Sequence, residues 1–403
     1  MLPNCIIEMI NIKNKLFGIS FILLFSSFSI IGFSQENLRV KAKKGQGVFS
    51  ILKKYNLNDS DCNKSHFYQL NDLKAGEGLK IGVEYELPIF VHVYNGTSIR
   101  STLGIKDFDE AVKIQDYNIG LKKAKVKSGD YRKDKVLWVP YHLFICPDIK
   151  DVTEIATSKE RIFPIFGEKY KKVTLKSNKL KGKVYYIVSG HGGPDPGAIN
   201  RARGWKICED EYAYDVALRL ARNLIEHGAI AYMIVRDNND GIRSGGTLKY
   251  DKDEVCWKNR AIPLSQKARL TQRSTAINTL YAYHKQKGYK EQYALMLHID
   301  SRKSNKRIDV FFYHHGTSPK GKKLALHLQK TIKGKYAKYQ KGRGYMGKVT
   351  SRDLHMLRET KPTSVYVEMG NIKSEADLQR FLKESNRQAL ANWLFEGLAG
   401  YKP

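Results

Sequence analysis

The second half of the chain alternates apolar runs with amphipathic stretches, and this alternation limits the folds open to it. Buried strands are predicted from five apolar runs, at residues 184–188, 231–235, 293–297, 308–313 and 365–367. Helices are predicted where apolar side chains recur at helical spacing, at residues 211–227, 267–284, 322–332 and 376–398. Strands that alternate with helices predict an α/β domain over residues 182–403, with a mostly parallel sheet and helices on both faces.

Polar residues follow three of these strands. His191 comes after Ser189-Gly190 and before two glycines that allow a tight turn, and His298 and Glu368 end later strands. Glu209 opens the first helix beyond that turn. Ligands of open α/β sheets bind at the carboxyl ends of the strands, so these side chains are expected to converge.

Two imidazoles and a carboxylate suit Zn²⁺ with one open position, and a further carboxylate would act on its water. The plainer alternative is that His191, His298 and Glu368 are polar residues at strand ends. Glu209 would then be an acid that stabilises a helix N-terminus, and Glu211 is its rival as a ligand.

At these residues the chain resembles the zinc-dependent N-acetylmuramoyl-L-alanine amidases of the amidase-3 type. The resemblance spans roughly 182–401 and is carried by residues 190–198, Glu209, 215–220, 235–237, 297–299, 357–358 and 365–372, in the family order. It implies that His191, Glu209 and His298 hold one Zn²⁺ and that Glu368 is the catalytic carboxylate. The implied reaction is hydrolysis, by zinc-activated water, of the amide between N-acetylmuramic acid and L-alanine of the peptidoglycan stem peptide.

The sequence departs from the family at two points. Ser189 stands where the family usually has Asp, which is expected to alter metal affinity because such residues orient a ligand. Asp300 follows Ile299 where Ala-Asn is common; it would orient water or substrate, or be a loop residue. Arg358 would grip a carboxylate of the stem peptide or make a plain ion pair. The long segment 238–263 would wall the groove, act as a lid or be a surface insertion.

The first half of the chain has a different pattern. Residues 38–89 predict a strand, two short helices and a strand, which resembles a LysM module, a family that binds N-acetylglucosamine-containing glycans. A generic small α+β domain is the alternative. Residues 90–150 loosely repeat this layout and are a degenerate second module or a linker domain. Residues 151–181 are predicted to be a linker, with 162–166 docking on a neighbour.

The N-terminus predicts export. Lys13 and Lys15 precede an apolar stretch that ends in small residues, so residues 1–34 are interpreted as a signal peptide cut near Ser34–Gln35. A membrane anchor is the alternative. We therefore expect a periplasmic or secreted protein that no longer contacts the membrane after cleavage.

Charge and cysteines refine that expectation. The net charge of +30 would draw the protein to polyanions, and export favours the anionic cell wall over nucleic acid, which is not expected as a partner. Cleavage removes Cys5, and of the remaining cysteines Cys208 and Cys256 share a domain and are expected to pair.

Two other functions fit the same residues. One is a zinc endopeptidase that cuts within the stem peptide, and the other is an inactive peptidoglycan-binding protein. The products released from peptidoglycan separate the first from an amidase, and zinc content together with a Glu368 variant separates the second. The sequence leaves the oligomeric state and any protein activator open.

Overall fold

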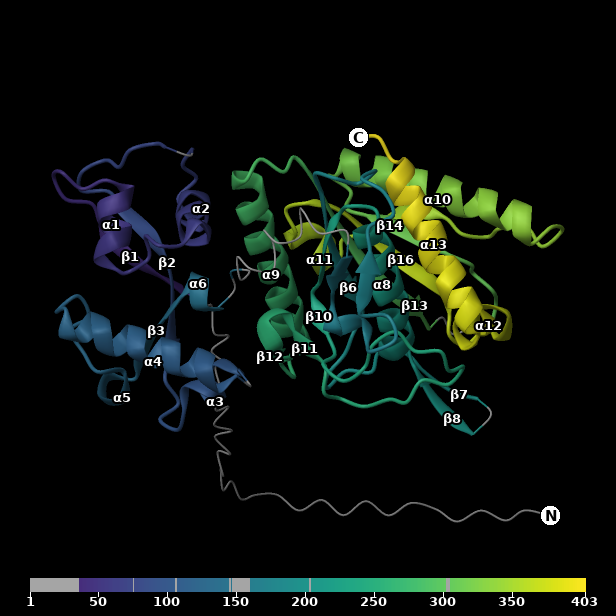
Figure 1. Cartoon of the computed structure of the whole chain (residues 1–403), viewed down its shortest axis with the longest axis horizontal. Helices are drawn as coiled ribbons and strands as arrows, with labels where there is room; N and C mark the ends of the chain where they lie inside the picture. The colour runs from purple at the N-terminus through teal and green to yellow at the C-terminus, as the bar shows by residue number, and fades with distance from the viewer. Residues whose placement is uncertain are drawn as a thin grey trace, which may run out of the picture. The chain divides into compact units, whose positions relative to one another are not determined.

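The larger part of the protein is built on one six-stranded sheet. The computed structural model describes residues 36–74, 76–105, 107–144, 146, 160–202, 204–301 and 305–403. In the large sheet the strand order is β15-β14-β16-β13-β6-β9. Figure 1 labels β14, β16, β13 and β6 of this sheet. The strands are β6 (Lys183–Ser189), β9 (Ile230–Met233), β13 (Glu291–Asp300), β14 (Phe311–His314), β15 (Val349–Ser351) and β16 (Thr363–Asn371). Neighbouring strands run parallel except β14 and β16, so the predicted mostly parallel sheet is confirmed.

Helices cover both faces of this sheet, as predicted. One face carries α8 (Glu209–Glu226), α10 (Pro319–Tyr339), α12 (Glu375–Leu382) and α13 (Glu384–Gly400). The other carries α9 (Gln266–Gln286) and α11 (His355–Glu359). Successive side chains of a strand point to opposite faces of the sheet. In β6, Tyr185 and Ile187 therefore belong to the hydrophobic core between the sheet and α8 (the α8 core), and Val184 and Tyr186 belong to the core between the sheet and α9 (the α9 core). The inner strands are therefore buried on both sides, which explains their continuous apolar runs, whereas the edge strand β15 is largely exposed.

Several elements differ from the prediction. The predicted closing helix is two helices, because Lys383 adopts an extended conformation (φ −99°, ψ 121°) between them. The strands β13 and β16 run further than predicted, so His298 and Glu368 lie within strands rather than beyond them. Two short pairings had no apolar signal long enough to predict: the hairpin of β7 (Ile199–Ala202) with β8 (Trp205–Cys208), and a small sheet of β10 (Val235–Arg236), β11 (Val255–Cys256) and β12 (Arg260–Ala261).

The segment 238–263 packs into the protein. Leu248 belongs to the α8 core, and Cys256 and Trp257, which begins the 3₁₀ turn η3 (Trp257–Asn259), belong to the α9 core. Arg243 forms an ion pair with the buried Glu211. These contacts hold the segment along much of its length, which favours a wall over a free lid.

Part of the predicted linker also has structure. Residues 151–159 lie outside the described part, and from residue 160 the chain forms the hairpin of β4 (Glu160–Ile162) and β5 (Lys172–Thr174), with the 3₁₀ turn η2 (Pro164–Phe166) between them. Phe166 and Val173 are buried in the α8 core. The docking expected of 162–166 is thus made by Phe166, while Ile162 is exposed.

The N-terminal part contains one three-stranded antiparallel sheet in the order β1-β2-β3. Its elements are β1 (Glu36–Lys41), α1 (Val48–Lys54), α2 (Asp61–Leu70), β2 (Glu84–Val93), α3 (Ile99–Leu103), α4 (Phe108–Lys123), α5 (Tyr131–Asp134), β3 (Val136–Pro140) and α6 (Tyr141–Phe144). The chain therefore passes twice through strand, helix, helix, strand, with the short helix α5 added before β3 in the second pass, and β2 ends the first pass and starts the second.

An asparagine marks the same place in both passes. The side-chain amide of Asn71 donates to the carbonyls of Phe67 and Glu86, and its oxygen accepts from the Glu86 N–H. Asn118 repeats all three bonds with Ile114 and Trp138. Asn71 thus ties the C-terminus of α2 to β2, and Asn118 ties the last two turns of α4 to β3. The shared pattern of bonds indicates a repeated unit.

The disulfide prediction is wrong. Cys62 pairs with Cys146, whereas Cys208 and Cys256 are free and buried. Cys208 ends β8, just before α8, and Cys256 lies in β11, so membership of one domain was too weak a criterion. The predicted signal peptide lies outside the described residues. Within the described ranges, no helix has both the length and the apolar character needed to cross a bilayer.

Candidate metal centre

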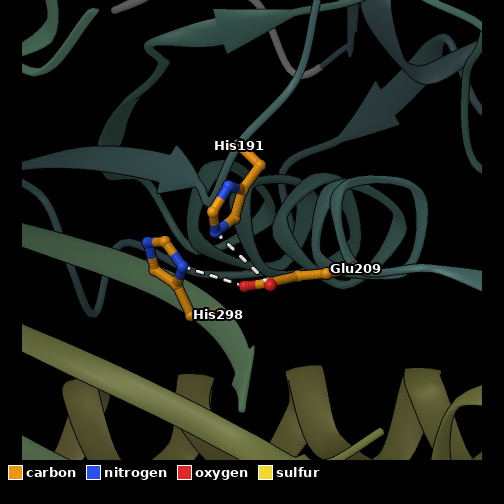
Figure 2. Close-up of side chains that lie close together, drawn as sticks. All are labelled: His191, Glu209 and His298. Atoms are coloured by element: carbon orange, nitrogen blue, oxygen red, sulfur yellow. Dashed lines mark hydrogen bonds and ion pairs between the residues drawn. The ribbon is translucent and has the colours of Figure 1, made fainter. Parts of the chain in front are cut away.

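Three of the predicted ligands meet at the carboxyl end of the sheet. His191 follows β6, His298 lies near the end of β13, and Glu209 begins α8. The Nε2 atom of His191 lies 3.3 Å from Oε2 of Glu209, and Nδ1 of His298 lies 2.9 Å from Oε1 of the same carboxylate (Figure 2). Residues distant in sequence are therefore gathered around one point by the strand ends.

This donor set fits a zinc ion. Ligand atoms at about 2.0–2.1 Å from a tetrahedral ion are separated from each other by roughly 3.3 Å. The two nitrogen–oxygen distances are close to that spacing, and each of the three residues offers a ligand atom within 4.8 Å of the others. Two histidines and one carboxylate also leave a fourth position open, as in catalytic zinc sites.

Two glycines make room for the ligands. A Cβ on Gly190 would lie 2.3 Å from Nδ1 of His298, and one on Gly197 would lie 2.6 Å from Oε2 of Glu209. Gly197 also has φ +67°, which side chains other than glycine rarely adopt. The backbone at both positions is thus shaped to let the ligands approach.

Asp195 orients His191. Its Oδ2 lies 3.0 Å from Nδ1 of the histidine and is also held by Arg269 at 2.6 Å. An ionised carboxylate can only accept, so Nδ1 carries the proton and the lone pair of Nε2 is directed towards Glu209. The hydroxyl of Ser189, by contrast, is buried with no hydrogen-bond partner among the described residues. Asp195 thus makes the contact that orients His191. It lies four residues further along the chain, in a turn that hydrophobic periodicity does not single out.

The backbone of His191 is also constrained. Its φ of +64° is uncommon for a residue with a side chain, and its carbonyl accepts a hydrogen bond from Nη2 of Arg273 at 2.6 Å. Strain of this kind persists only where surrounding contacts hold it, and it concentrates at functional sites.

Burial and charge act differently on the three ligands. Burial lowers the pKa of His298, which keeps that ring neutral and able to coordinate a metal. Burial also acts on His191, but the hydrogen bond to Asp195 and the charge of Glu209 outweigh it and raise the pKa. For Glu209, burial raises the pKa, while the bond with His298 and the charges of both histidines lower it overall, so this carboxylate is ionised.

Glu368 lies beside this group. In the parallel pairing of β13 with β16, His298 is in register with Glu368, so the two side chains leave the sheet on the same face. Glu368 is only 7% exposed. Tyr366, two residues earlier on that face, stacks on the His298 ring with centroids 4.2 Å apart. The predicted catalytic carboxylate is thus adjacent to a ligand without being one of the three.

The other candidates lie elsewhere. Glu211 is turned towards Arg243, at 2.8 Å, so Glu209 is the carboxylate next to the histidines. Asp300 ends β13, and its carbonyl accepts from the N–H of Ile372. Arg358 lies on α11, is largely exposed, and pairs with Asp353 at 2.5 Å and with Glu359 at 2.9 Å. The plain ion-pair alternative therefore describes Arg358 in this structure.

Comparison with known proteins gives a family match over the same region. Residues 186–400, more than half of the chain, match the model of the N-acetylmuramoyl-L-alanine amidase family. The germination-specific N-acetylmuramoyl-L-alanine amidase of Bacillus subtilis is 22% identical over 223 residues, which are 55% of this chain and 81% of that protein. The probable cell wall amidase LytH of Staphylococcus aureus is 25% identical over 232 residues, which are 57% of this chain and 61% of that protein.

Solved structures were found for the same part of the chain. The CwlD amidase from Clostridioides difficile, solved in complex with the GerS lipoprotein, is 16% identical with a TM-score of 0.39 and covers 54% of this chain and 96% of that one. The catalytic domain of CwlV, from Bacillus (Paenibacillus) polymyxa var. colistinus, is 18% identical with a TM-score of 0.38 and covers the same shares, 54% and 96%.

Proposed function

Because this chain belongs to the N-acetylmuramoyl-L-alanine amidase family, we propose that it hydrolyses peptidoglycan at a zinc centre formed by His191, Glu209 and His298. The family and its relatives support hydrolysis of the amide between muramic acid and L-alanine. The observation that carries the zinc centre is the approach of two histidines to opposite oxygens of Glu209, at 3.3 Å and 2.9 Å.

Zinc bound there would supply a Lewis acid for the amide carbonyl and a nucleophile at neutral pH. The residues around the centre hold its ligands in place. Asp195 and Arg273 hold the imidazole and the carbonyl of His191, so the ring is fixed before substrate arrives. The short loop from Pro196 to Ala198 holds Glu209 from its other side, since the Ala198 N–H donates to Oε2 of Glu209 at 2.8 Å.

Glu368 is the proposed proton carrier. It lies in register with His298 and is nearly buried, and these two observations support its assignment as the base that takes a proton from the attacking water. The same carboxyl would return the proton to the leaving amine of L-alanine. General acid–base groups of this kind contribute about 10²- to 10⁴-fold to rate.

Two variants separate these roles. Glu368→Gln should lower hydrolysis by about 10²- to 10⁴-fold while zinc content stays near one ion per chain. His298→Ala should lose zinc and activity together. The assay is mass spectrometry of the fragments released from purified peptidoglycan, with and without a chelator.

Free stem peptides that begin in L-alanine support the amidase, whereas fragments cut within the stem peptide support an endopeptidase. Intact peptidoglycan after incubation with zinc-loaded protein indicates the inactive binding protein. Glu368→Gln that retains full activity would overturn the assignment of the carboxylate.

We also propose that the N-terminal part retains the enzyme on glycan strands, as a repeated LysM-like unit. The twofold strand–helix–helix–strand path and the matching bonds of Asn71 and Asn118 support this reading. Binding by one part of a chain raises the effective concentration of the other at the wall. Full-length Glu368→Gln protein should sediment with peptidoglycan, and chitin oligosaccharides should compete; sedimentation that they leave unchanged counts against glycan binding.

The site of action follows from the substrate. Relatives that act on the cell wall imply action outside the cytoplasm. We propose a periplasmic or secreted location reached through the signal peptide of residues 1–34. Fractionation of cells that express the full chain, with N-terminal sequencing of the exported form, tests both statements. An uncleaved chain in the membrane fraction would contradict the signal-peptide reading.

A further inference from the structure

A second group of carboxylates lies next to the metal centre and has no part in the proposed reaction. It consists of Asp210 and Glu211, in the first turn of α8, and Glu254, which precedes β11. Their exposed fractions are 2%, 2% and 6%. Each offers an oxygen within 4.8 Å of the oxygens offered by the other two. The negative charge of three carboxylates this close together and this buried must be balanced by a cation or by protons.

The protein balances only part of this charge. Arg243 donates to Oε2 of Glu211 at 2.8 Å, and among the described residues it is the one cation paired with the three. Three ionised carboxylates and one guanidinium leave a charge of minus two. A buried charge is costly unless it is paired or bound to a metal.

Asp210 shows that hydrogen bonds do not satisfy the group. Its Oδ1 accepts from the N–H of Glu211 at 3.0 Å. Its Oδ2 is buried and has no hydrogen-bond partner among the residues that the structure describes. A protonated carboxyl would need an acceptor for its O–H, and an ionised one would need a donor. Neither is present, so the oxygen is left for a ligand that is not a side chain.

We propose that Asp210, Glu211 and Glu254 bind one Ca²⁺ ion. Calcium takes oxygen ligands at about 2.3–2.6 Å, so two oxygens on opposite sides of one ion lie about 4.6–5.2 Å apart. The separations within this group do not exceed 4.8 Å, which allows all three residues to reach one ion. Magnesium keeps several waters and fits a buried set of carboxylates less well.

Bound calcium would stiffen the two segments that carry zinc ligands. Oε2 of Glu254 accepts a hydrogen bond from the N–H of Gly193 at 2.6 Å, two residues after His191. Asp210 directly follows Glu209 on α8. One ion would therefore fasten the turn of His191 to the helix end of Glu209. This binding does not require that the chain hydrolyse anything.

Terbium luminescence tests the proposal on the full chain. Tb³⁺ occupies calcium sites and emits when a nearby aromatic ring is excited. Tyr250, four residues before Glu254 in the chain, is the expected donor ring. Tb³⁺ should bind the zinc-loaded protein saturably, and CaCl₂ should displace it with an affinity between about 10⁻⁶ and 10⁻³ M.

Two variants of the proposed ligands and two controls locate the ion. Asp210→Asn and Glu254→Gln should each weaken Ca²⁺ by at least about tenfold, because affinity follows the number of charged ligands. Asp353→Asn is the matched control, since Asp353 is exposed and paired with Arg358, and it should bind as the wild type does. His298→Ala removes a zinc ligand and should also bind Ca²⁺ normally.

Melting curves provide a readout that a misfolded variant cannot imitate. Ca²⁺ should raise the Tm of the wild type. Without Ca²⁺, Asp210→Asn should melt higher than the wild type because one repelling charge is gone, and at the same Ca²⁺ concentration its Tm should rise less. Binding that is absent up to about 10 mM, tenfold above weak extracellular sites, would overturn the proposal. So would Ca²⁺ binding that is as tight in Asp210→Asn as in the wild type, or that disappears in His298→Ala.

Discussion

Replacing Asp195 tests how the histidine ligand is oriented. In Asp195→Ala the bond to Nδ1 of His191 disappears, and so does the ion pair between Asp195 and Arg269. The imidazole can then rotate, and its Nε2 lone pair no longer faces Glu209. Zinc affinity should fall while the fold survives, because the side chain of Asp195 is partly exposed, at 27%.

The size of the effect can be worked out in two ways. Removing a partner that orients a metal ligand costs about 10- to 100-fold in affinity, or about 1.4–2.8 kcal/mol. A hydrogen bond that involves a charged group is worth about 1.5–3 kcal/mol. The two ranges agree. Asp195→Asn keeps an acceptor but loses the charge, and neutral hydrogen bonds are roughly half as strong, so its loss should be about 3- to 10-fold.

The assay is competition for zinc with a chromophoric chelator at pH 8, where histidine is largely neutral in both proteins. Ser189→Ala is the matched control. Its hydroxyl is buried without a partner, so removing it should leave zinc affinity unchanged even though the family usually has Asp there. Melting curves of the zinc-free proteins separate a loss of affinity from a loss of fold.

Equal zinc affinity in Asp195→Ala and the wild type would refute the orienting role. An effect of Ser189→Ala as large as that of Asp195→Ala would do the same, because it would assign the role to the family position after all.

Three further predictions concern the fold around the centre. Gly197→Ala should lower zinc affinity at least about tenfold, because the added Cβ would clash with Glu209. Gly182→Ala is the control, since Gly182 also has a positive φ but has open space around it, and this variant should bind zinc as the wild type does. Equal losses of affinity in the two variants would exclude the clash as the cause. Reducing the Cys62–Cys146 bond, which spans 84 residues, should lower the free energy of unfolding by about 4.5 kcal/mol in the chain-entropy treatment. In the control variant Cys62→Ser/Cys146→Ser, reductant should leave unfolding unchanged. An equal effect of reductant on this variant would refute the assignment to this disulfide. Burial lowers the pKa of His66 to about 3, so between about pH 6.5 and 3 this side chain takes up a proton only when the protein unfolds. The free energy of unfolding should therefore fall by up to about 1.4 kcal/mol for each pH unit from pH 6.5 towards 3. Urea titrations should show that the free energy of unfolding depends less on pH in His66→Phe than in the wild type, and an unchanged dependence would contradict this.

Hydrophobic periodicity in the sequence predicts those parts of the candidate site that lie on or directly after the strands. The apolar runs were enough to expect His191, His298 and Glu368 at one edge of the sheet, although His298 and Glu368 lie within β13 and β16 rather than beyond them; the roles of the three residues stay predictions. Parallel strands bring their carboxyl ends to one edge, so knowing the strands was enough to expect the cluster. The mostly parallel sheet followed from the same alternation.

What the sequence did not predict depends on contacts between loops. Asp195 belongs to a turn without periodicity, and only the folded backbone brings it to Nδ1 of His191. The carboxylates of Asp210 and Glu254 are 44 residues apart in the numbering and meet because the segment before β11 packs on α8. The pairing of Cys62 with Cys146 depends likewise on a tertiary approach that domain membership does not reveal.

The middle strand of the N-terminal sheet has a consequence for how that region can be divided. Residues 84–91 of β2 include all its partners in β1, and residues 89–93 pair with β3, so the two stretches overlap. A cut after residue 89 would give each half only a fragment of this strand and leave backbone amides and carbonyls without partners. Gene fusions or deletions that treat the halves as interchangeable units should therefore yield aggregating fragments, and the region should be moved or removed only as a whole.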